Sequence, residues 1–430
     1  MSTHDDLLAR RRAVMPEWLA ISYERPIALE RGEGTYVWDA EGNRYLDFFG
    51  GILTTMLGHR FAPVLDAIRA QADRILHTST LYLSEPTIEL AEVVAELSGI
   101  PDAKVFFTTS GTEANDAALL LATSYRRSNQ VLALRNSYHG RSFSTVSVTG
   151  HRSWSPTSYS GLAVSYVHGG YRLRSPFRHL DDEAYTRACV EDLQQVIDMT
   201  TAGDVACLIA EPIQGVGGVA MPPPGFFGAM KQRLDEHGIL FISDEVQTGW
   251  GRTGSGFWGY ESHGVVPDLL TFAKGVGNGL ALGGVVGRAE VMDHLTANSI
   301  STFGGNPLAA AGALATIGHV VDHDLQANAA AMGARLGEGL SAASASDPTV
   351  GEIRGTGLMW AIETVRPGGI EPDPQRAAAI HEATRDAGLL IGRGGLYGNV
   401  LRIAPPLNVG SSEIDEAVTI VDGILGDVSS

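Results

Sequence analysis

The segment TFAKGVGNG, Thr271–Gly279, marks the end of a buried strand in an α/β chain. It places Lys274 where the apolar run Leu269–Ala273 gives way to glycines. Only three lysines occur in 430 residues, and the other two, Lys104 and Lys231, have surroundings typical of solvated side chains. An amine that is partly shielded from water at a strand end is disfavoured as an ammonium ion and suits imine chemistry. The alternative is a glycine-flanked lysine at the surface.

The composition indicates a soluble globular protein that binds neither nucleic acid nor membrane. Hydrophobic residues make up 44% of the chain, and its 52 glycines are dispersed among apolar segments. A formal charge of -18 disfavours binding to a polyanion. We find no signal-peptide pattern and no apolar stretch long enough to span a bilayer, so we expect a cytoplasmic protein. Cys189 and Cys207 give neither a disulfide framework nor metal-ligand spacing, and no metal site is expected.

Residues 62–318 alternate short apolar runs with longer helical periods, the pattern of parallel strands joined by crossover helices. We predict an α/β fold whose large domain, residues 62–318, has a mainly parallel sheet between helices. Residues 1–61 and 319–430 are predicted to form a smaller α+β lobe from both ends of the chain. The predicted strands of the large domain cover residues 105–108, 131–134, 145–148, 206–210, 240–243, 269–272 and 284–286, with helices at 113–127 and 226–237.

The two ends of the chain carry shorter elements. Residues 34–48 predict two short strands about a turn at Glu41, Gly42 and Asn43. Toward the C-terminus the pattern predicts helices at residues 320–340 and 375–387 and strands at 353–354, 359–363 and 400–404.

Polar side chains follow most of the predicted strands of the large domain. Parallel sheets bind ligands beyond the C-terminal ends of their strands, so these side chains are expected to share a site. The residues at these strand ends are Ser110, Gly111 and Thr112, then Tyr138, His139 and Gly140, and then Glu211, Asp244, Glu245 and Lys274.

The segment TTSGTEAND, Thr108–Asp116, has the features of an anion site. It begins as a strand ends and continues as an apolar helix, so the amides of Ser110, Gly111 and Thr112 lie at a helix N-terminus that favours a phosphate. The alternative is an ordinary cap in which Ser110 and Glu113 bond the first turn. No glycine loop ends in GK[ST], so a Walker-type nucleotide site is not supported.

Asp244 follows the apolar run Ile239–Ser243, where a carboxylate is costly without a cationic partner. A protonated ring nitrogen would be such a partner. Glu245 is an alternative functional acid, and two solvated acids in a loop are the other alternative. Tyr138 offers an aromatic face for stacking or for core packing, and His139 is more typical of a supporting hydrogen-bonding residue than of a metal ligand.

Together these residue types are those that pyridoxal phosphate requires. Lys274 offers an imine partner, and the helix that starts near Gly111 offers a phosphate anchor. Asp244 offers a counter-charge for the ring nitrogen, and Tyr138 a stacking surface. Their joint occurrence in one α/β frame is a stronger argument for this cofactor than any one of them.

Seven segments resemble class III, omega-type aminotransferases, in the same order and over nearly the whole chain. The nearest relatives are expected among the alanine:glyoxylate aminotransferase 2-like enzymes and the 4-aminobutyrate aminotransferases. The resemblance implies the type I fold of pyridoxal-phosphate-dependent transferases. The segments are SGTEAND (Ser110–Asp116), SYHGRS (Ser137–Ser142), AEPIQGVGG (Ala210–Gly218), SDEVQTGWGRTG (Ser243–Gly254), FAKGVGNG (Phe272–Gly279), STFGGNP (Ser301–Pro307) and LRIAPPL (Leu401–Leu407).

The resemblance also implies roles for individual residues. Lys274 would form the Schiff base and move the proton, with Asp244 at the ring nitrogen and Gln247 near the ring hydroxyl. Thr302 would reach the phosphate of the neighbouring subunit's cofactor, which implies a homodimer, or a tetramer. The other implied cofactor-binding residues are Ser110, Gly111 and Thr112 at the phosphate, Tyr138 and Val246 on the two ring faces, and His139.

Substrate residues follow from the same resemblance. Arg402 would bind an α-carboxylate, and Glu211 would pair with Arg402 when the other substrate has none, so that the pair acts as a switch. Arg141 matches a position at which 4-aminobutyrate enzymes hold a distal carboxylate, and Ile52 completes the substrate site. The implied reaction is ping-pong transfer, via pyridoxamine phosphate, from an omega-amino acid (4-aminobutyrate, beta-alanine or 3-aminoisobutyrate type) to 2-oxoglutarate, pyruvate or glyoxylate.

Other functions remain open at this point. Dialkylglycine decarboxylation, racemisation and aminomutase reactions use the same cofactor frame, so cofactor residues do not separate them from transamination. A nicotinamide-dependent oxidoreductase is disfavoured because Gly275–Gly279 lacks the G-x-G-x-x-G spacing. A binding protein that has lost catalysis is disfavoured because every cofactor position is filled.

Overall fold

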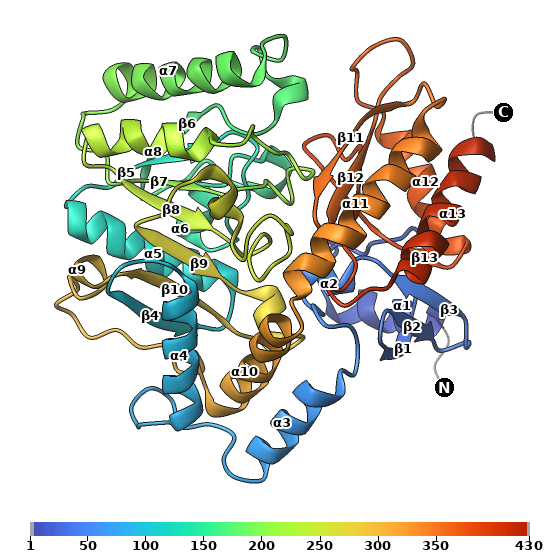
Figure 1. Cartoon of the computed structure of the whole chain (residues 1–430), viewed down its shortest axis with the longest axis horizontal. Coiled ribbons are helices and arrows are strands. Elements are labelled where there is room, and N and C mark those ends of the chain that lie inside the picture. Colours follow the sequence, from blue (N-terminus) through green and yellow to red (C-terminus); the bar gives the residue numbers. More distant parts are fainter. Residues whose placement is uncertain (1–3, 428–430) are drawn as a thin grey trace.

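A seven-stranded sheet forms the centre of the computed structural model, which describes residues 4–427 (Figure 1). The strand order is β4-β10-β9-β8-β7-β5-β6, and β10 alone runs against the direction of the others. The predicted, mainly parallel sheet is therefore confirmed. Its strands are β4 (Ala103–Thr108), β5 (Gln130–Leu134), β6 (Ala163–Val167), β7 (Cys207–Ala210), β8 (Leu240–Asp244), β9 (Leu269–Phe272) and β10 (Gly283–Arg288).

Helices cover both faces of this sheet, because alternate strand residues point to opposite faces. Ile209 packs on the side of α5 (Gly111–Arg126), whereas Leu208 packs on the side of α7 (Asp182–Thr200) and α8 (Phe226–Glu236). With both faces covered, the central strands are buried along their whole length and are mainly apolar. The other helices of this part are α3 (Ala62–Ala72), α4 (Glu85–Leu97), α6 (Phe143–Ser147), α9 (Ala289–Met292), α10 (Pro307–Asp322) and the 3-10 turns η1 (Arg152–Trp154), η2 (Arg172–Arg174), η3 (Gly259–His263) and η4 (Lys274–Gly277).

Residues 145–148, predicted as a strand, belong to a helix instead, and the sheet uses β6 in their place. The β-branched residues of this run favour a strand, but Ser142 caps α6 reciprocally with Thr145 and starts a helix. The helix predicted at residues 320–340 is also two helices, α10 and α11 (Leu325–Ser344). They separate at Asp324, whose left-handed backbone (φ 47°) turns the chain while its carboxylate caps α11.

The two ends of the chain meet in a smaller lobe, blue and red in Figure 1. The predicted turn at residues 41–43 is confirmed, and the β3 strand that follows it pairs in parallel with β13 from the other end of the chain. A second sheet has the order β11-β12-β15-β14. The boundaries after residues 61 and 318 remain predictions. The elements are α1 (His4–Val14), β1 (Leu29–Glu33), β2 (Tyr36–Asp39), β3 (Arg44–Asp47), α2 (Gly50–Leu53), β11 (Val350–Thr356), β12 (Met359–Thr364), α12 (Pro374–Asp386), β13 (Leu389–Leu390), β14 (Gly392–Gly394), β15 (Val400–Ile403) and α13 (Ser411–Asp427).

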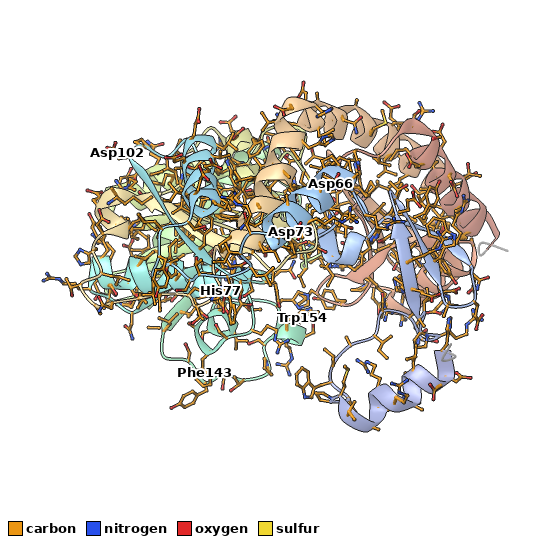
Figure 2. The ribbon with its side chains drawn as sticks, turned by 90° about the horizontal axis from the view of Figure 1, so that it is seen from below. Asp66, Asp73, His77, Asp102, Phe143 and Trp154 are labelled. Atoms are coloured by element: carbon orange, nitrogen blue, oxygen red, sulfur yellow. The ribbon has the colours of Figure 1, made fainter. Side chains whose placement is uncertain are left out.

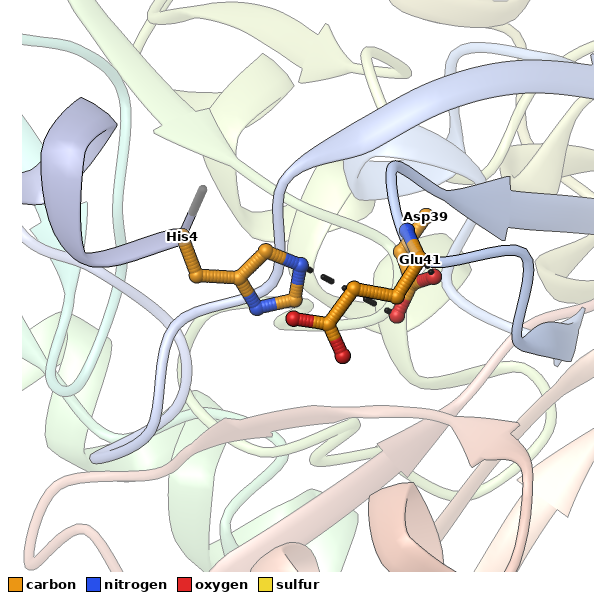
Figure 3. A group of neighbouring side chains, drawn as sticks. All are labelled: His4, Asp39 and Glu41. Carbon is orange, nitrogen blue, oxygen red and sulfur yellow. Dashed lines mark hydrogen bonds and ion pairs between the residues drawn. The ribbon is translucent and has the colours of Figure 1, made fainter. Parts of the chain in front are cut away.

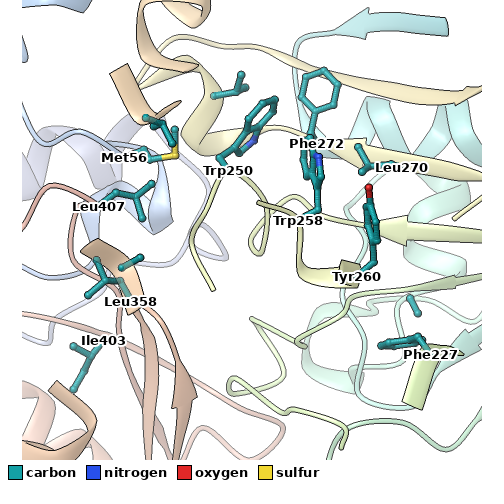
Figure 4. Close-up of a cluster of buried hydrophobic side chains, with 14 of the residues drawn as sticks. Met56, Phe227, Trp250, Trp258, Tyr260, Leu270, Phe272, Leu358, Ile403 and Leu407 are labelled. Atoms are coloured by element: carbon teal, nitrogen blue, oxygen red, sulfur yellow. The ribbon is translucent and has the colours of Figure 1, made fainter. Parts of the chain in front are cut away.

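One buried cluster continues from the large sheet into the smaller lobe. It joins Trp250 and Phe272 to Met56, Ile403 and Leu407 (Figure 4). The C-terminal end of β9 therefore lies where the two parts of the chain pack together. Within residues 4–427 the structure contains no helix with the length and apolar character needed to cross a membrane.

Candidate active site

A cavity of about 360 Å3 lies at the C-terminal ends of the parallel strands. It is lined by side chains that the sequence placed directly after five different strands, as expected for a parallel sheet. The predicted residues that line it are Ser110, Gly111, Thr112, Tyr138, His139, Glu211, Asp244, Val246, Gln247 and Lys274.

Lys274 begins the turn η4 directly after β9, with a left-handed backbone (φ 49°). Gly275 follows it, and a Cβ there would lie 2.9 Å from the sulfur of Met56, so a larger residue would require the Met56 side chain to move. The pKa of the Lys274 amine is lowered from 10.5 to about 8, mainly by burial and also by the charge of Arg402, while Asp244 and Glu211 oppose the change. The side chain is thus a usable nucleophile near neutral pH.

Asp244, the last residue of β8, is held by two buried side chains. Its Oδ2 accepts hydrogen bonds from His139 Nδ1 at 2.8 Å and from Asn115 Nδ2 at 2.7 Å. Asn115 in turn accepts a bond from the Thr271 hydroxyl at 2.6 Å. The other oxygen, Oδ1, accepts only the amide of Val246, at 3.1 Å, and keeps capacity for a cationic partner.

Asn115 was not among the predicted site residues, although it lines the cavity. A signal for it exists in the sequence. It shares the buried face of α5 with Ala114, Ala118 and Leu119, and a polar residue on an otherwise apolar face requires a hydrogen-bond partner.

The N-terminus of α5 serves both as a capped helix and as an anion cradle. Ser110 Oγ accepts the amide of Glu113 at 3.3 Å, and the Glu113 carboxylate folds back onto Thr109 at 2.7 Å. The first-turn amides of Gly111 and Thr112 have no partner within the helix. The predicted cap and the predicted anion site are therefore compatible.

Two glycines keep this cradle open. A Cβ on Gly140, whose φ is 134°, would lie 2.7 Å from the hydroxyl of Thr112. A Cβ on Gly111 would lie 3.0 Å from the methyl groups of Val246. Because neither glycine carries a side chain, space remains beside the backbone of both segments for a phosphate and a ring. This space and the helix N-terminus fit the size and charge of pyridoxal phosphate.

The predicted pair of Glu211 and Arg402 is not formed in this structure. Glu211 accepts the amides of Tyr138 and Gly215, both at 2.9 Å, whereas Arg402 Nη2 donates to Gln247 Oε1 at 3.0 Å. Backbone amides of the large domain thus bind the Glu211 carboxylate, and Gln247 accepts a hydrogen bond from the Arg402 guanidinium. The substrate-dependent pair of Glu211 and Arg402 therefore stays a prediction, and Gln247 has Arg402 as a partner in addition to the expected cofactor hydroxyl.

Burial perturbs both of these charged groups. It raises the pKa of Glu211 to about 7, with the negative charge of Asp244 acting in the same direction and the charge of His139 opposing it. Burial lowers the pKa of Arg402 to about 10, while Glu211 opposes the change. Arg402 Nε is buried without a hydrogen-bond partner, and no carboxylate among residues 4–427 forms a salt bridge with this side chain. The guanidinium is available to an anionic ligand.

Four predicted substrate or cofactor residues do not line the cavity: Arg402 is buried near Lys274, and the other three are exposed. Arg141 is exposed, with its guanidinium carbon 5.8 Å from the ring centre of Trp18. Ile52 is 47% exposed in the left-handed turn of α2, where its φ is 71°. Thr302 is exposed on the loop before α10. None of the three touches the cavity within this chain.

A separate cluster of potential metal ligands, His4, Asp39 and Glu41, lies at the N-terminal lobe (Figure 3). Asp39 is already saturated. Its Oδ1 accepts the amides of Glu41 and Asn43, and its Oδ2 accepts the Asn43 side chain and the Tyr45 hydroxyl. These bonds shape the turn between β2 and β3, and the carboxylate has little capacity left for a cation.

The sequence profile of the family Aminotransferase class-III matches residues 20–425. The chain belongs to the class III aminotransferases. It is 38% identical over 426 residues to the mitochondrial alanine–glyoxylate aminotransferase 2 homolog 2 of Arabidopsis thaliana, covering 97% of this chain and 87% of that protein. It is 35% identical to the 4-aminobutyrate aminotransferase GabT of Escherichia coli K12, covering 98% of each. The (S)-enantioselective omega-transaminase of Thermomicrobium roseum has a similar structure, with a TM-score of 0.92, 34% identity and full coverage of both chains.

Membership of this class establishes the chemistry in outline. The protein is a pyridoxal-phosphate-dependent aminotransferase with the type I fold of that cofactor family, and its substrates are amino and keto acids. The predicted family, fold, cofactor and enzyme class are confirmed, and the nicotinamide and non-catalytic alternatives are excluded.

Proposed function

We propose that this class III aminotransferase transfers an amino group from an omega-amino acid to a small keto acid by a ping-pong mechanism. The observation that carries the acceptor half is Arg402, a buried guanidinium beside Lys274 that forms no salt bridge within residues 4–427. A keto acid brings a carboxylate to such a group, and burial strengthens the resulting pair. The donor half is supported by relatives whose names specify 4-aminobutyrate and 5-aminovalerate.

The cavity residues have complementary tasks in this proposal. When bound, pyridoxal phosphate supplies an aldehyde that condenses with amines and a protonated ring that accepts electrons. The amides of Gly111 and Thr112 would hold its phosphate. Asp244, oriented by Asn115 and His139, would keep the ring nitrogen protonated.

Lys274 would bind the cofactor and then carry protons between carbon atoms of the substrate, because its lowered pKa lets the amine both accept and release a proton near neutral pH. Tyr138 and Val246 line the cavity and would cover the two ring faces.

Glu211 would move between two partners. Its carboxylate now rests on the amides of Tyr138 and Gly215 and has a pKa of about 7, so it is easily protonated or ionised. When an omega-amino acid without an α-carboxylate binds, we propose that Glu211 leaves these amides and neutralises Arg402. A keto acid would take its place, so the two substrates share one cation.

A second copy of the chain would complete the site. The exposed apolar residues Leu81, Tyr82 and Leu83 lie between His77 and Thr87, which both contact the loop that carries Thr302. The rings of His77 and Phe303 lie 5.0 Å apart, tying the two segments together. An exposed apolar surface of this kind is typical of a protein interface. We therefore propose a homodimer in which Thr302 reaches the partner's cofactor phosphate.

The experiment compares the two half-reactions by stopped-flow absorbance of the cofactor. Arg402→Gln should slow the keto-acid half-reaction by about a hundredfold, since a buried charge pair is worth about 2 to 5 kcal/mol, and should affect the donor half-reaction much less. Glu211→Gln should show the opposite preference. Arg393→Gln is the matched control, because Arg393 is exposed on β14, next to the strand that carries Arg402. Equal losses in both half-reactions for the Arg402 and Glu211 variants would reject the switch.

A further inference from the structure

A second cavity, of about 850 Å3, lies apart from the cofactor cavity, between the loop of residues 152–158 and the segment that follows β6. That volume is typical of sites for small-molecule ligands. Its lining includes Arg135, Arg152, Arg174 and His168. Among residues 4–427, no aspartate or glutamate lines it.

Two of these guanidinium groups, those of Arg135 and Arg152, are exposed at the cavity and form no salt bridge within residues 4–427. Arg135 donates to Nε2 of His168 at 2.8 Å. The pKa of His168 is lowered by burial and by Arg135, so its ring accepts this bond as the neutral form. The nearby Asp192 is engaged by the backbone amide of His168 at 2.9 Å. In a protein of net charge -18, this concentration of positive charge requires an explanation.

The same cavity contains an unsatisfied acceptor and an aromatic wall. Asn136 is 4% exposed, and its amide nitrogen donates to Gly217 while its Oδ1 is buried without a partner. Tyr397 is half exposed, with the guanidinium of Arg174 5.3 Å from its ring centre. The charge of Arg174 itself is balanced by Glu363 at 2.7 Å. A ligand that satisfies these groups carries an anion, an N–H or O–H donor and a flat or apolar body.

We propose that this cavity binds an organic phosphate monoester. A phosphate monoester carries up to two negative charges and accepts hydrogen bonds on three oxygens, so one such group offers enough acceptors for both Arg135 and Arg152. A hydroxyl or amino group of the organic part donates to Oδ1 of Asn136, and that part lies against Tyr397.

The loop of residues 152–158 lines the second cavity and contacts Tyr138, a residue that lines the cofactor cavity. Trp154 of this loop contacts the ring of Tyr138 edge to face, with the ring centres 5.4 Å apart, and lies on the side of the large domain that faces the N-terminal segment (Figure 2). Arg152 and Ser155 of the same loop line the second cavity. A ligand in the second cavity therefore contacts a loop that packs against the cofactor site. Because Trp154 lies on this loop, its fluorescence should change when the ligand binds.

Isothermal titration calorimetry on the cofactor-loaded enzyme tests the proposal, with adenosine monophosphate as the probe. Ribose monophosphate, adenosine and inorganic phosphate are the comparison ligands. Adenosine monophosphate should bind saturably, and Arg135→Gln with Arg152→Gln should weaken it about tenfold or more, because charge-assisted hydrogen bonds are lost. Arg187→Gln is the matched control, since this exposed arginine lies on α7, the helix that also supplies the lining residue Tyr185. It should change the dissociation constant by less than about twofold.

Binding must also be distinguished from occupation of the cofactor site. Arg402→Gln should leave the affinity for adenosine monophosphate unchanged. Tryptophan emission should change on binding in the wild type and not in Trp154→Phe.

Several results would overturn the proposal. They are no saturable binding, affinity that is unaffected by loss of Arg135 and Arg152, equal affinity for adenosine, or equal affinity for inorganic phosphate. An emission change that persists in Trp154→Phe would place the ligand elsewhere.

Discussion

Uptake of pyridoxal phosphate by the cofactor-free enzyme should follow the ionisation of Lys274 and level off near pH 8. Only the neutral amine attacks an aldehyde, so the rate depends on the fraction of Lys274 that is deprotonated. Burial lowers the pKa of this amine from 10.5 to about 8, and Arg402 acts in the same direction.

The size of the effect follows from these two values. Their difference corresponds to roughly 3 kcal/mol of selective destabilisation of the ammonium ion. At about pH 7.5, roughly a quarter of the sites then carry a neutral amine, against about one in a thousand for an ordinary lysine. The buried amine should therefore react about two hundred times faster than a solvated one at that pH.

The assay follows the visible absorbance of the bound cofactor after stopped-flow mixing, from about pH 6 to pH 10. The rate should rise about tenfold per pH unit below pH 8 and become constant above it. Arg402→Gln removes a cation that lowers the pKa of Lys274, so the plateau should move to higher pH. Glu211→Gln removes an anion that raises the pKa of Lys274, so the plateau should move to lower pH. The exposed Arg393→Gln serves as control.

A rate that keeps rising tenfold per pH unit up to pH 10 would show that Lys274 titrates as an ordinary lysine. The reasoning would also be wrong if Arg402→Gln left the pH of the plateau unchanged.

Three further variants test other parts of the site and its frame. Asp244→Asn should lower turnover by about a hundredfold or more while cofactor still binds, because a neutral amide no longer holds the ring nitrogen protonated, and unchanged single-turnover rates would rule out this role. Glu245→Ala should reduce the free energy of unfolding in urea by about 3 kcal/mol, because four hydrogen-bond donors lose their buried acceptor; a loss no larger than in exposed Glu236→Ala would contradict this. Arg141→Ala should raise the KM for 4-aminobutyrate and spare simple alkylamines, and an unchanged donor profile would remove Arg141 from the substrate site.

Much of the frame was predictable because local patterns and global topology agree. Apolar runs of four to six residues between helical periods indicate buried parallel strands, and β9 begins and ends where its sequence predicts. The errors arose where a local hydrogen bond outweighs propensity. Ser142 starts a helix in a β-branched run, and Asp324 divides a continuous helical pattern into two helices.

The composition of the cofactor site was predictable for a related reason. Carboxyl ends of parallel strands meet at one edge, so Glu211, Asp244 and Lys274 were expected to be neighbours before their distances were known. Asn115 was missed because its importance depends on a partner, Asp244, that is more than a hundred residues away in the chain.

The sequence by itself determined which chemistry is available. It provides Lys274, an amine shielded from water in a chain whose basic residues are mostly arginines, a carboxylate at the end of an apolar strand, and glycines that let the backbone approach a phosphate. Only the tertiary structure decided how these groups are paired and charged. In the structure Glu211 accepts two backbone amides, and Arg402 donates to Gln247. The physical reason is that hydrogen-bond partners and pKa values depend on burial and on distances of a few ångströms between residues far apart in the chain, which no local pattern specifies.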